Sequence, residues 1–271
     1  MKQLIRFAKA EATGNDFVVV DAAELDLDRV GPETIKRLCD RHFGVGGDGA
    51  IMIREDSDSD FIFDYYNADG YKSTMCGNGS RAAVLTANVF GYVKRNQELF
   101  FKAPDGIHRA RIESNDRIRV EILTDNRPEM FDHDPFGLPG EMQPVAFLNT
   151  GVPHLVIQAE RDIEMIDVAT IGSRLRHESR FPEGTNVNFV QVCEDRSIKI
   201  RTYERGVEAE TLACGTGVTA SALALWTQTA AAGNRRCVET RGGLIQVIRD
   251  AGSVFIEGPA RVVFVGEYLL N

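Results

Sequence analysis

The chain has 271 residues, a formal net charge of −9 at pH 7, 43% hydrophobic residues and 26% charged residues. Such a composition suits a globular protein with a packed core, and the length allows one large domain or two ordinary ones. The acidic balance, without a basic stripe, argues against nucleic-acid binding, and no stretch is apolar over the roughly 18 residues of a membrane span.

The N-terminal sequence and the cysteines indicate the compartment. Residues 1–17 contain basic side chains but only short apolar pieces, so they do not form a signal peptide. The five cysteines are an odd number without C-x-x-C spacing, which favours neither zinc nor a disulfide framework. We therefore expect a cytoplasmic protein that binds no metal, no membrane and no nucleic acid.

The first half of the chain contains a glycine-rich loop and a cysteine that precedes a helix. "GVGGDG" (44–49) leads into the strand-like "AIMIRE" and not into a helix with Lys-Ser/Thr, so a nucleotide site is not expected. "TMCGNGSRAA" (74–83) places Cys76 before an Ala-rich helix predicted over Ser80–Phe90. "RIRVEI" alternates as a strand, and Asn115-Asp116 before it predicts a tight hairpin.

Residues 125–144 contain four of the nine prolines, a density that prevents a continuous helix or a central strand. This segment is predicted to connect two domains. Beyond it, "LACGTGVTAS" (212–221) places Cys214 before a second apolar helix, predicted over Val218–Thr229. "SIKIRTY", "LIQVIRD", "SVFIEG" and "RVVFVGEYLL" are predicted strands.

The two halves repeat one another. "TGNDFVVVD" at residue 13 recurs as "TGVPHLVIQ" 137 residues later, and Cys76 recurs as Cys214 after 138 residues. "RLCDRHF" and "FDYYNADG" have counterparts at the same spacing and in the same order, in "RLRHESRF" and "IRTYERGV". Four pairs of matching segments thus share one spacing of 137–138 residues, which an internal duplication explains.

We therefore predict an α+β fold of two pseudo-symmetric duplicated domains, each a curved, mostly antiparallel sheet or barrel around a central helix. The N-terminal half is expected over 1–124 and the C-terminal half over 145–260. The last strand, about 261–271, is expected to return to the first half.

Both cysteines lie at a predicted helix start, where unpaired N–H groups and the helix dipole favour a thiolate and bind anions. If the copies face one another, one cysteine lies on each side of a bound carboxylate's α-carbon. One thiolate then removes the α-proton while the opposite thiol delivers another, which inverts the centre. Cys39, Cys193 and Cys237 are expected to be small hydrophobic core residues.

At these motifs the sequence resembles the diaminopimelate epimerases, which work without pyridoxal. The matching pieces span nearly the whole chain: "TGNDFVVVD", "DRHFGVGGDG", "YYNADG", "MCGNGSRAA", "NTGVPH", "TNVNFVQV", "YERG" and "ACGTG". The resemblance implies interconversion of LL- and meso-2,6-diaminopimelate for lysine and peptidoglycan precursor synthesis, no cofactor, a small amino-acid substrate and a possible homodimer.

The resemblance also implies roles for individual residues. Cys76 and Cys214 are the acid/base pair, with Cys76 the donor in the LL-to-meso direction, and His154 and Glu204 tune the thiols. The expected substrate contacts are Asn15, Asn67, Gly77, Asn78, Asn186, Glu204, Arg205, Gly215 and Thr216. The chain departs from the common family pattern at Glu11-Ala12, at Gly49, which is often Gln, and at Val152, which is often Asn.

Three alternatives remain open from the residues alone. A related two-cysteine enzyme could racemise proline or hydroxyproline, although "YERG" and the several Asn residues favour a diamino diacid. A duplicated binding protein could use the helix ends without proton transfer. A thiol hydrolase is disfavoured, because it needs one His-activated cysteine and not a matched pair.

Overall fold

The computed structural model describes residues 3–23, 25, 30–114, 116–124, 127–160, 162–228 and 233–270. The chain divides into two compact units. The first comprises Met1–Glu121 with Gly258–Asn271, and the second comprises Ile122–Glu257.

The first unit is built on one sheet with strand order β17-β1-β2-β3-β4-β5-β6-β7. Neighbours are antiparallel except β2–β3 and β4–β5. Its strands are β1 (Gln3–Ala12), β2 (Asn15–Asp21), β3 (Gly49–Arg54), β4 (Phe61–Asn67), β5 (Glu98–Ala103), β6 (Gly106–Ser114), β7 (Arg117–Ile122) and β17 (Arg261–Leu270). Its helices are α1 (Pro32–Cys39) and α2 (Gly77–Phe90).

The second unit has the strand order β8-β9-β10-β11-β12-β14-β15-β16, with parallel pairs at β10–β11 and β12–β14. The strands are β8 (Glu129–Met130), β9 (Met142–Asn149), β10 (Pro153–Ala159), β11 (Asn186–Val192), β12 (Ile198–Glu204), β13 (Ala209–Thr211), β14 (Arg235–Thr240), β15 (Gly243–Asp250) and β16 (Ser253–Pro259). The helices are η2 (Ile163–Met165), α3 (Val168–Arg176) and α4 (Gly215–Gln228).

The two units share one topology. Antiparallel and parallel pairs follow one another in the same order from β17–β1 to β6–β7 and from β8–β9 to β15–β16. The helices α2 and α4 occupy the same place in this order, and each spans 14 residues. The predicted α+β fold with duplicated domains is confirmed.

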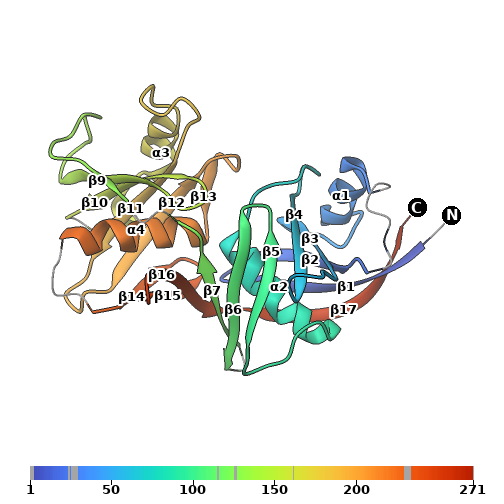
Figure 1. Ribbon diagram of the computed structural model, residues 1–271. Coiled ribbons are helices and arrows are strands. Elements are labelled where there is room, and N and C mark those ends of the chain that lie inside the picture. The colour runs from blue at the N-terminus through green and yellow to red at the C-terminus, as the bar shows by residue number, and fades with distance from the viewer. Residues whose placement is uncertain are drawn as a thin grey trace. The chain divides into compact units, whose positions relative to one another are not determined.

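The central helices are buried because their sequences are small and apolar on all sides. In the first unit, α2 packs against β1, β2, β3, β4 and β6. In the second, α4 runs between β9–β12 on one side and β14–β15 on the other (Figure 1). The shorter helices α1 and α3 cover the sheets from outside, where their apolar residues join separate core clusters.

Both central helices begin three residues earlier than predicted, at Gly77 and Gly215. The N–H of Ser80 donates to the carbonyl of Cys76 at 2.7 Å, and the N–H of Val218 donates to the carbonyl of Cys214 at 2.9 Å. The glycine-rich first turns, which propensity disfavours, are therefore already helical. The second helix was predicted to end at Thr229, which lies outside the described residues; α4 is described as far as Gln228.

The proline-rich segment packs on the second unit. Phe136 lies in that unit's core, and its carbonyl accepts a hydrogen bond from Arg174 at 2.8 Å. At the other end of the chain, β17 pairs antiparallel with β1 from Gln3 to Glu11. Asn115 of the predicted hairpin lies outside the described residues, while β6 and β7 on either side of it pair antiparallel.

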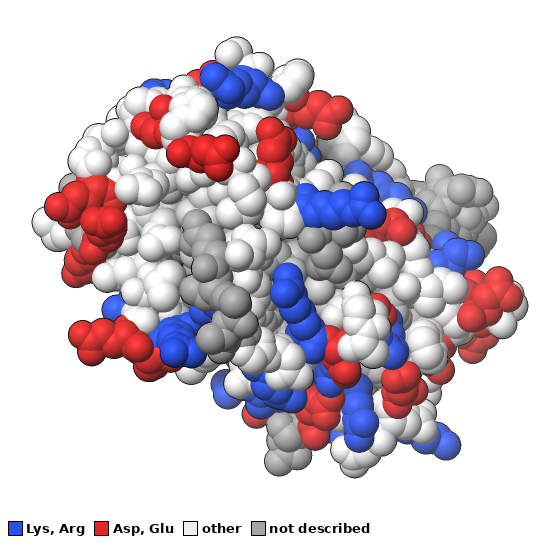
Figure 2. Space-filling model, turned by 60° about the vertical axis from the view of Figure 1, so that its left-hand side comes forward, with Lys and Arg blue, Asp and Glu red and all other residues white. Residues whose placement is uncertain are grey.

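Acidic and basic side chains are interspersed on the face shown in Figure 2. Among the described helices, none combines the length and hydropathy needed to span a bilayer.

Candidate active site

Cys76 is the N-cap residue of α2. Its backbone is extended, with φ −114° and ψ 117°, and its half-buried sulfur accepts a hydrogen bond from the N–H of Gly79 at 3.4 Å. Gly77 and Asn78 form the buried first turn. The thiol therefore lies at the positive end of the helix dipole, beside N–H groups that α2 leaves without helical partners.

A fully buried arginine lies beneath this turn. Nη2 of Arg81 donates to Oγ1 of Thr13 at 2.8 Å and to Oδ1 of Asn78 at 3.0 Å. Burial lowers the pKa of Arg81 to about 10, so the guanidinium remains charged at neutral pH, and charge attraction from Cys76 and Glu11 opposes this drop. A permanent cation thus lies close to the Cys76 thiol.

Asn15 and Asn78, two predicted substrate contacts, lie next to one another. Nδ2 of Asn78 donates to Oδ1 of Asn15 at 3.4 Å, and Nδ2 of Asn15 donates to Asp48 at 2.7 Å. Arg41 in turn pairs with Asp48 at 2.8 Å and with Asp16 at 2.7 Å. Although burial alone raises it, the pKa of Asp16 is held well below its usual range by Arg41 and Lys9. This charged cluster fixes Asn15 at the start of β2.

The structure accounts for two of the departures from the family pattern. A Cβ at Gly49 would lie 2.6 Å from Cε2 of Tyr65, so that aromatic ring occupies the space that a longer side chain needs. Glu11 accepts a hydrogen bond from the N–H of Gly14 at 3.2 Å and thereby supports the β1–β2 turn.

Asn67, another predicted substrate contact, lies exposed at the end of β4, and its carbonyl closes the turn to Gly70.

Cys214 is buried and immediately precedes α4. Its sulfur lies 3.4 Å from Oγ1 of Thr216, which lies 3.0 Å from Nε2 of His154. Nδ1 of His154 lies 3.1 Å from Nδ2 of Asn188. A chain of polar contacts therefore runs from the interior of the sheet to the thiol.

The hydrogen-bond partners of His154 show which of its ring nitrogens carries the hydrogen. Asn188 also donates to the carbonyl of Leu155 at 3.1 Å and accepts from Thr202 at 3.1 Å, which fixes the orientation of its amide. Nδ1 is therefore an acceptor and Nε2 carries the hydrogen that is donated to Thr216. Complete burial lowers the pKa of His154 to about 3, so the ring is neutral. His154 reaches the thiol through the hydroxyl of Thr216.

The close approach of α4 to this ring requires a glycine. A Cβ at Gly217 would lie 2.4 Å from Oδ1 of Asn188 and 3.3 Å from Cε1 of His154. The hydroxyl of Thr150 donates to the carbonyl of Thr216 at 3.0 Å and holds the first turn from the other side.

Asn186, Glu204 and Arg205 lie near one another at the ends of β11 and β12. The Asn186 amide donates to the carbonyl of Pro153 at 3.0 Å and accepts the N–H of Arg205 at 2.8 Å. The Arg205 guanidinium donates to the carbonyl of Glu183 at 3.0 Å, and Glu204 accepts from the Thr211 hydroxyl at 2.9 Å. Asn186 thus also ties two strand ends together.

Four residues around the cysteines were not singled out from the sequence: Thr13, Arg81, Asn188 and Thr202. The sequence offered one sign that Arg81 is special, since it is the only charged residue in the α2 sequence.

The other three cysteines differ from one another. Cys39 is buried as expected, and burial raises the pKa of its thiol to about 12, which keeps it protonated. Cys193 and Cys237 are only partly buried, so the prediction of core positions was wrong for them. Cys193 directly follows the end of β11, and Cys237 lies on the more exposed face of β14. Within the described ranges no three His, Cys, Asp or Glu side chains are grouped to hold a metal.

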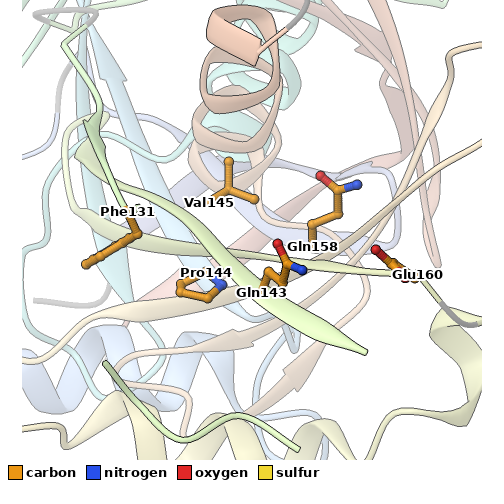
Figure 3. A pocket seen from close by; sticks show the side chains of 6 residues that line it. All are labelled: Phe131, Gln143, Pro144, Val145, Gln158 and Glu160. Carbon is orange, nitrogen blue, oxygen red and sulfur yellow. The ribbon is translucent and has the colours of Figure 1, made fainter. Parts of the chain in front are cut away.

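A small cavity elsewhere in the second unit involves none of the predicted site residues. Its lining consists of Phe131, Gln143, Pro144, Val145, Gln158 and Glu160, with Gln143–Val145 on β9 and Gln158 on the neighbouring β10 (Figure 3). Its volume of about 110 Å³ is below the roughly 300 Å³ of a typical ligand pocket. The cysteine environments are the stronger candidate.

Known proteins match this chain over most of its length. The sequence profile of the family described as diaminopimelate epimerase matches residues 7–126 and 146–263. A diaminopimelate epimerase from Flavobacterium psychrophilum is 37% identical, over 96% of this chain and 98% of its own.

Two solved structures share the fold at low sequence identity. A PhzF-family phenazine biosynthesis protein from Bacillus anthracis superposes with a TM-score of 0.76 at 15% identity, covering 98% of this chain and 99% of its own. A probable proline racemase from Agrobacterium radiobacter superposes with a TM-score of 0.71 at 15% identity, covering 98% and 93%.

Proposed function

The chain belongs to the diaminopimelate epimerase family, and we propose that it interconverts LL- and meso-2,6-diaminopimelate by moving an α-proton between Cys76 and Cys214. This reaction serves lysine and peptidoglycan precursor synthesis. The observation that carries the mechanism is that the two duplicated units each place a cysteine directly before the central helix.

In the proposed reaction one cysteine is a thiolate and the other a thiol. The thiolate takes the α-proton, the C–H electron pair becomes a carbanion stabilised by the adjacent carboxylate, and the opposite thiol protonates this carbon. One thiol and one thiolate remain, with their roles exchanged. The mechanism requires both sulfurs to reach one α-carbon from opposite faces.

The carbanion must be stabilised without a cofactor in this proposal. The N–H groups of Gly77-Asn78 and Gly215-Thr216, in the first turns of α2 and α4, are suited to hold the reacting carboxylate as its negative charge grows. Glycines allow the backbone to approach the substrate closely.

The substrate has a second amino-acid end that does not react. We assign its recognition to Asn15, Asn67, Asn186 and Arg205, because amides offer both donors and acceptors and a guanidinium pairs with a carboxylate. The Arg205 guanidinium donates to the backbone carbonyl of Glu183, a neutral acceptor, so its charge is suited to pair with an anion. Glu204, beside it in sequence, is assigned to the amino group or to thiol tuning.

Proline racemisation is not favoured. The probable proline racemase shares the fold at 15% identity, whereas the Flavobacterium relative is 37% identical over nearly the whole chain. A similarity at 15% identity extends to the fold and not to the substrate.

We also propose that the chain is cytoplasmic and forms a homodimer. The five cysteines, all within the described residues, form no disulfide, which suits a reducing compartment, and the proposed reaction needs two of them reduced. On β17 three consecutive apolar side chains, Val263, Phe264 and Val265, are 46–56% exposed. Such a patch on a strand favours burial against a second copy.

The test is to incubate the reduced protein with LL-diaminopimelate in D₂O and to follow both α-deuterium and the LL/meso ratio. We expect deuterium to enter with formation of the meso isomer, and inversion to be lost in Cys76→Ala and in Cys214→Ala. Cys193→Ala, which alters another free cysteine, is the matched control and should remain active.

Each outcome bears on a different part of the proposal. Absence of exchange by the wild type would reject this substrate. Full inversion by either active-site variant would reject the two-cysteine mechanism. Substrate binding without exchange, even in the wild type, would support a binding protein instead.

A further inference from the structure

The duplication places different chemistry behind the two cysteines. Gly79 and Gly217 are each the third residue after the cysteine, and each packs on two side chains of the sheet. Gly79 faces the apolar Phe17 and Ile51, whereas Gly217 faces the polar His154 and Asn188. These side chains occupy corresponding positions, 137 residues apart, in the two sheets.

The fifth residue after each cysteine also differs. In α4 this residue is Thr219, whose hydroxyl donates to the carbonyl of Gly215 at 2.9 Å. In α2 it is Arg81, whose Nη1 lies 3.4 Å from the corresponding carbonyl of Gly77. The first unit therefore has a cation where the second has a neutral hydroxyl.

The oxygens that Arg81 contacts are all neutral: the hydroxyl of Thr13, the amide of Asn78 and the carbonyl of Gly77. Its Nε has no hydrogen-bond partner in the described part of the chain, and the side chain is 0% exposed. A buried cation without a bonded carboxylate is costly, so it needs a nearby anion.

Three charged groups act on this guanidinium. Cys76, in the preceding turn, and Glu11, on β1, attract it, and Arg117, on β7, repels it. Glu11 is partly exposed and screened by solvent. The other charged groups near this end of the sheet, Lys9, Asp16, Arg41 and Asp48, are paired among themselves.

We propose that Arg81 is a positioning residue that holds Cys76 as the thiolate in the free enzyme, so that the two cysteines begin the cycle with different charges. The inference rests on the proposed two-cysteine reaction. Cys214 instead contacts the neutral hydroxyl of Thr216, and the His154 ring behind that hydroxyl is uncharged. The free enzyme is therefore predominantly Cys76 thiolate with Cys214 thiol.

The same guanidinium also shapes the site. By bonding to Asn78 and Thr13, it joins the first turn of α2 to the β1–β2 turn. Asn78 contacts Asn15, so Arg81 supports one predicted substrate contact as well as the thiolate. A test must separate the charge effect from this structural one.

The test is to alkylate the wild type with iodoacetamide between pH 5 and 10 and to quantify the Cys76 and Cys214 peptides separately by mass spectrometry. Alkylation reports the thiolate and needs no substrate. We expect Cys76 to be half-maximally reactive at a lower pH than Cys214. A midpoint of Cys76 equal to or above that of Cys214 would overturn the proposal without any variant.

Two variants then isolate the charge. In Arg81→Gln, with folding checked by circular dichroism, the Cys76 midpoint should rise by about one pH unit, so that alkylation at a pH well below both midpoints becomes about tenfold slower. Arg81→Lys should keep the wild-type midpoint. Thr219→Val, at the corresponding position of α4, is the matched control and should leave the Cys76 midpoint unchanged. A folded Arg81→Gln with the wild-type Cys76 midpoint would refute the assignment.

This readout is independent of turnover. If the midpoints behave as expected but deuterium exchange with diaminopimelate fails, the assignment of substrate is wrong and the role of Arg81 stands. If exchange succeeds but the midpoints do not differ, the substrate assignment stands and the proposed role of Arg81 is wrong.

Discussion

Oγ1 of Thr216 lies 3.0 Å from Nε2 of His154 and bridges this buried ring to the Cys214 sulfur, 3.4 Å away. Because Nε2 donates its hydrogen to the hydroxyl, the hydroxyl hydrogen is free to point at the sulfur. A hydrogen bond of this kind stabilises the thiolate more than the thiol. A neutral histidine can thus assist an anion without carrying a charge itself.

Removal of this bridge should weaken Cys214 as a base. Thr216→Val keeps the shape of the side chain but removes the hydroxyl, and a hydrogen bond to a charged group contributes about 1.5–3 kcal/mol. We expect the pH midpoint of Cys214 alkylation to rise by about one unit and kcat to fall about tenfold or more. Thr216→Ser retains the oxygen and should be close to wild type; equal behaviour of the Val and Ser variants would rule out the bridge.

The buried histidine should also make stability depend on pH. Folding lowers the pKa of His154 from 6.5 to about 3 because burial disfavours the charged ring. Between these values the unfolded chain binds the additional proton, so the free energy of unfolding falls as the pH drops below about 6.5. At pH 5.0 this loss is about 2 kcal/mol, since one pKa unit corresponds to about 1.4 kcal/mol.

Urea unfolding at pH 7.5 and 5.0 measures this loss. The decrease should be smaller by about 2 kcal/mol in His154→Gln, which cannot take up the proton. His133→Gln, at an exposed position of the same unit, should show the full wild-type decrease. An unchanged decrease in His154→Gln would mean that the ring is not held neutral.

The repeat in the sequence was enough to predict the fold class. Strand alternation, two apolar helices and one constant offset each carry local information, and the two copies agree with one another. The position of each cysteine directly before a helix could be predicted for the same reason, because the two motifs share one arrangement of cysteine, glycines and a small, apolar run. The helix starts were misplaced by three residues, since glycine-rich turns have low intrinsic helix propensity.

The surroundings of the thiols could not be predicted, because they depend on strand register and burial. Asn188 meets Thr202 only because these residues are opposite one another in the β11–β12 register. Arg81 is fully buried, whereas arginine is usually exposed, so residue type alone predicts a surface position for it. The contacts of Asn188 with His154 and of Arg81 with Thr13 join residues 34 and 68 positions apart in the chain, and periodicity carries no information about them.

The proposed dimer can be tested on β17. Val263 and Val265 are both about half exposed on this strand, and their joint replacement by Glu would place two carboxylates in an apolar interface. We expect sedimentation equilibrium to give about twice the 30.0 kDa chain mass for the wild type and the monomer mass for the double variant. Leu244→Glu, which alters a similarly exposed residue of β15, should leave the mass unchanged; a monomeric wild type would contradict the proposal.

The two glycines that follow the cysteines should respond differently to the same substitution. In Gly217→Ala the new Cβ would lie 2.4 Å from Oδ1 of Asn188, an atom held by Thr202, so the polar chain behind Cys214 must shift. Overpacking of this kind costs about 1–3 kcal/mol, and helix propensity returns up to about 1 kcal/mol. In Gly79→Ala the nearest atom is Cδ1 of Ile51, at 3.3 Å, the mobile end of a flexible side chain.

We therefore expect Gly217→Ala to lower both the free energy of unfolding and kcat, and Gly79→Ala to change stability by less than about 1 kcal/mol. Urea unfolding and initial rates of meso-isomer formation measure the two effects. The comparison is internally controlled, because both glycines occupy the third helical position of corresponding helices. Equal losses in the two variants would show that helix geometry, and not contact with Asn188 and His154, explains the requirement for glycine.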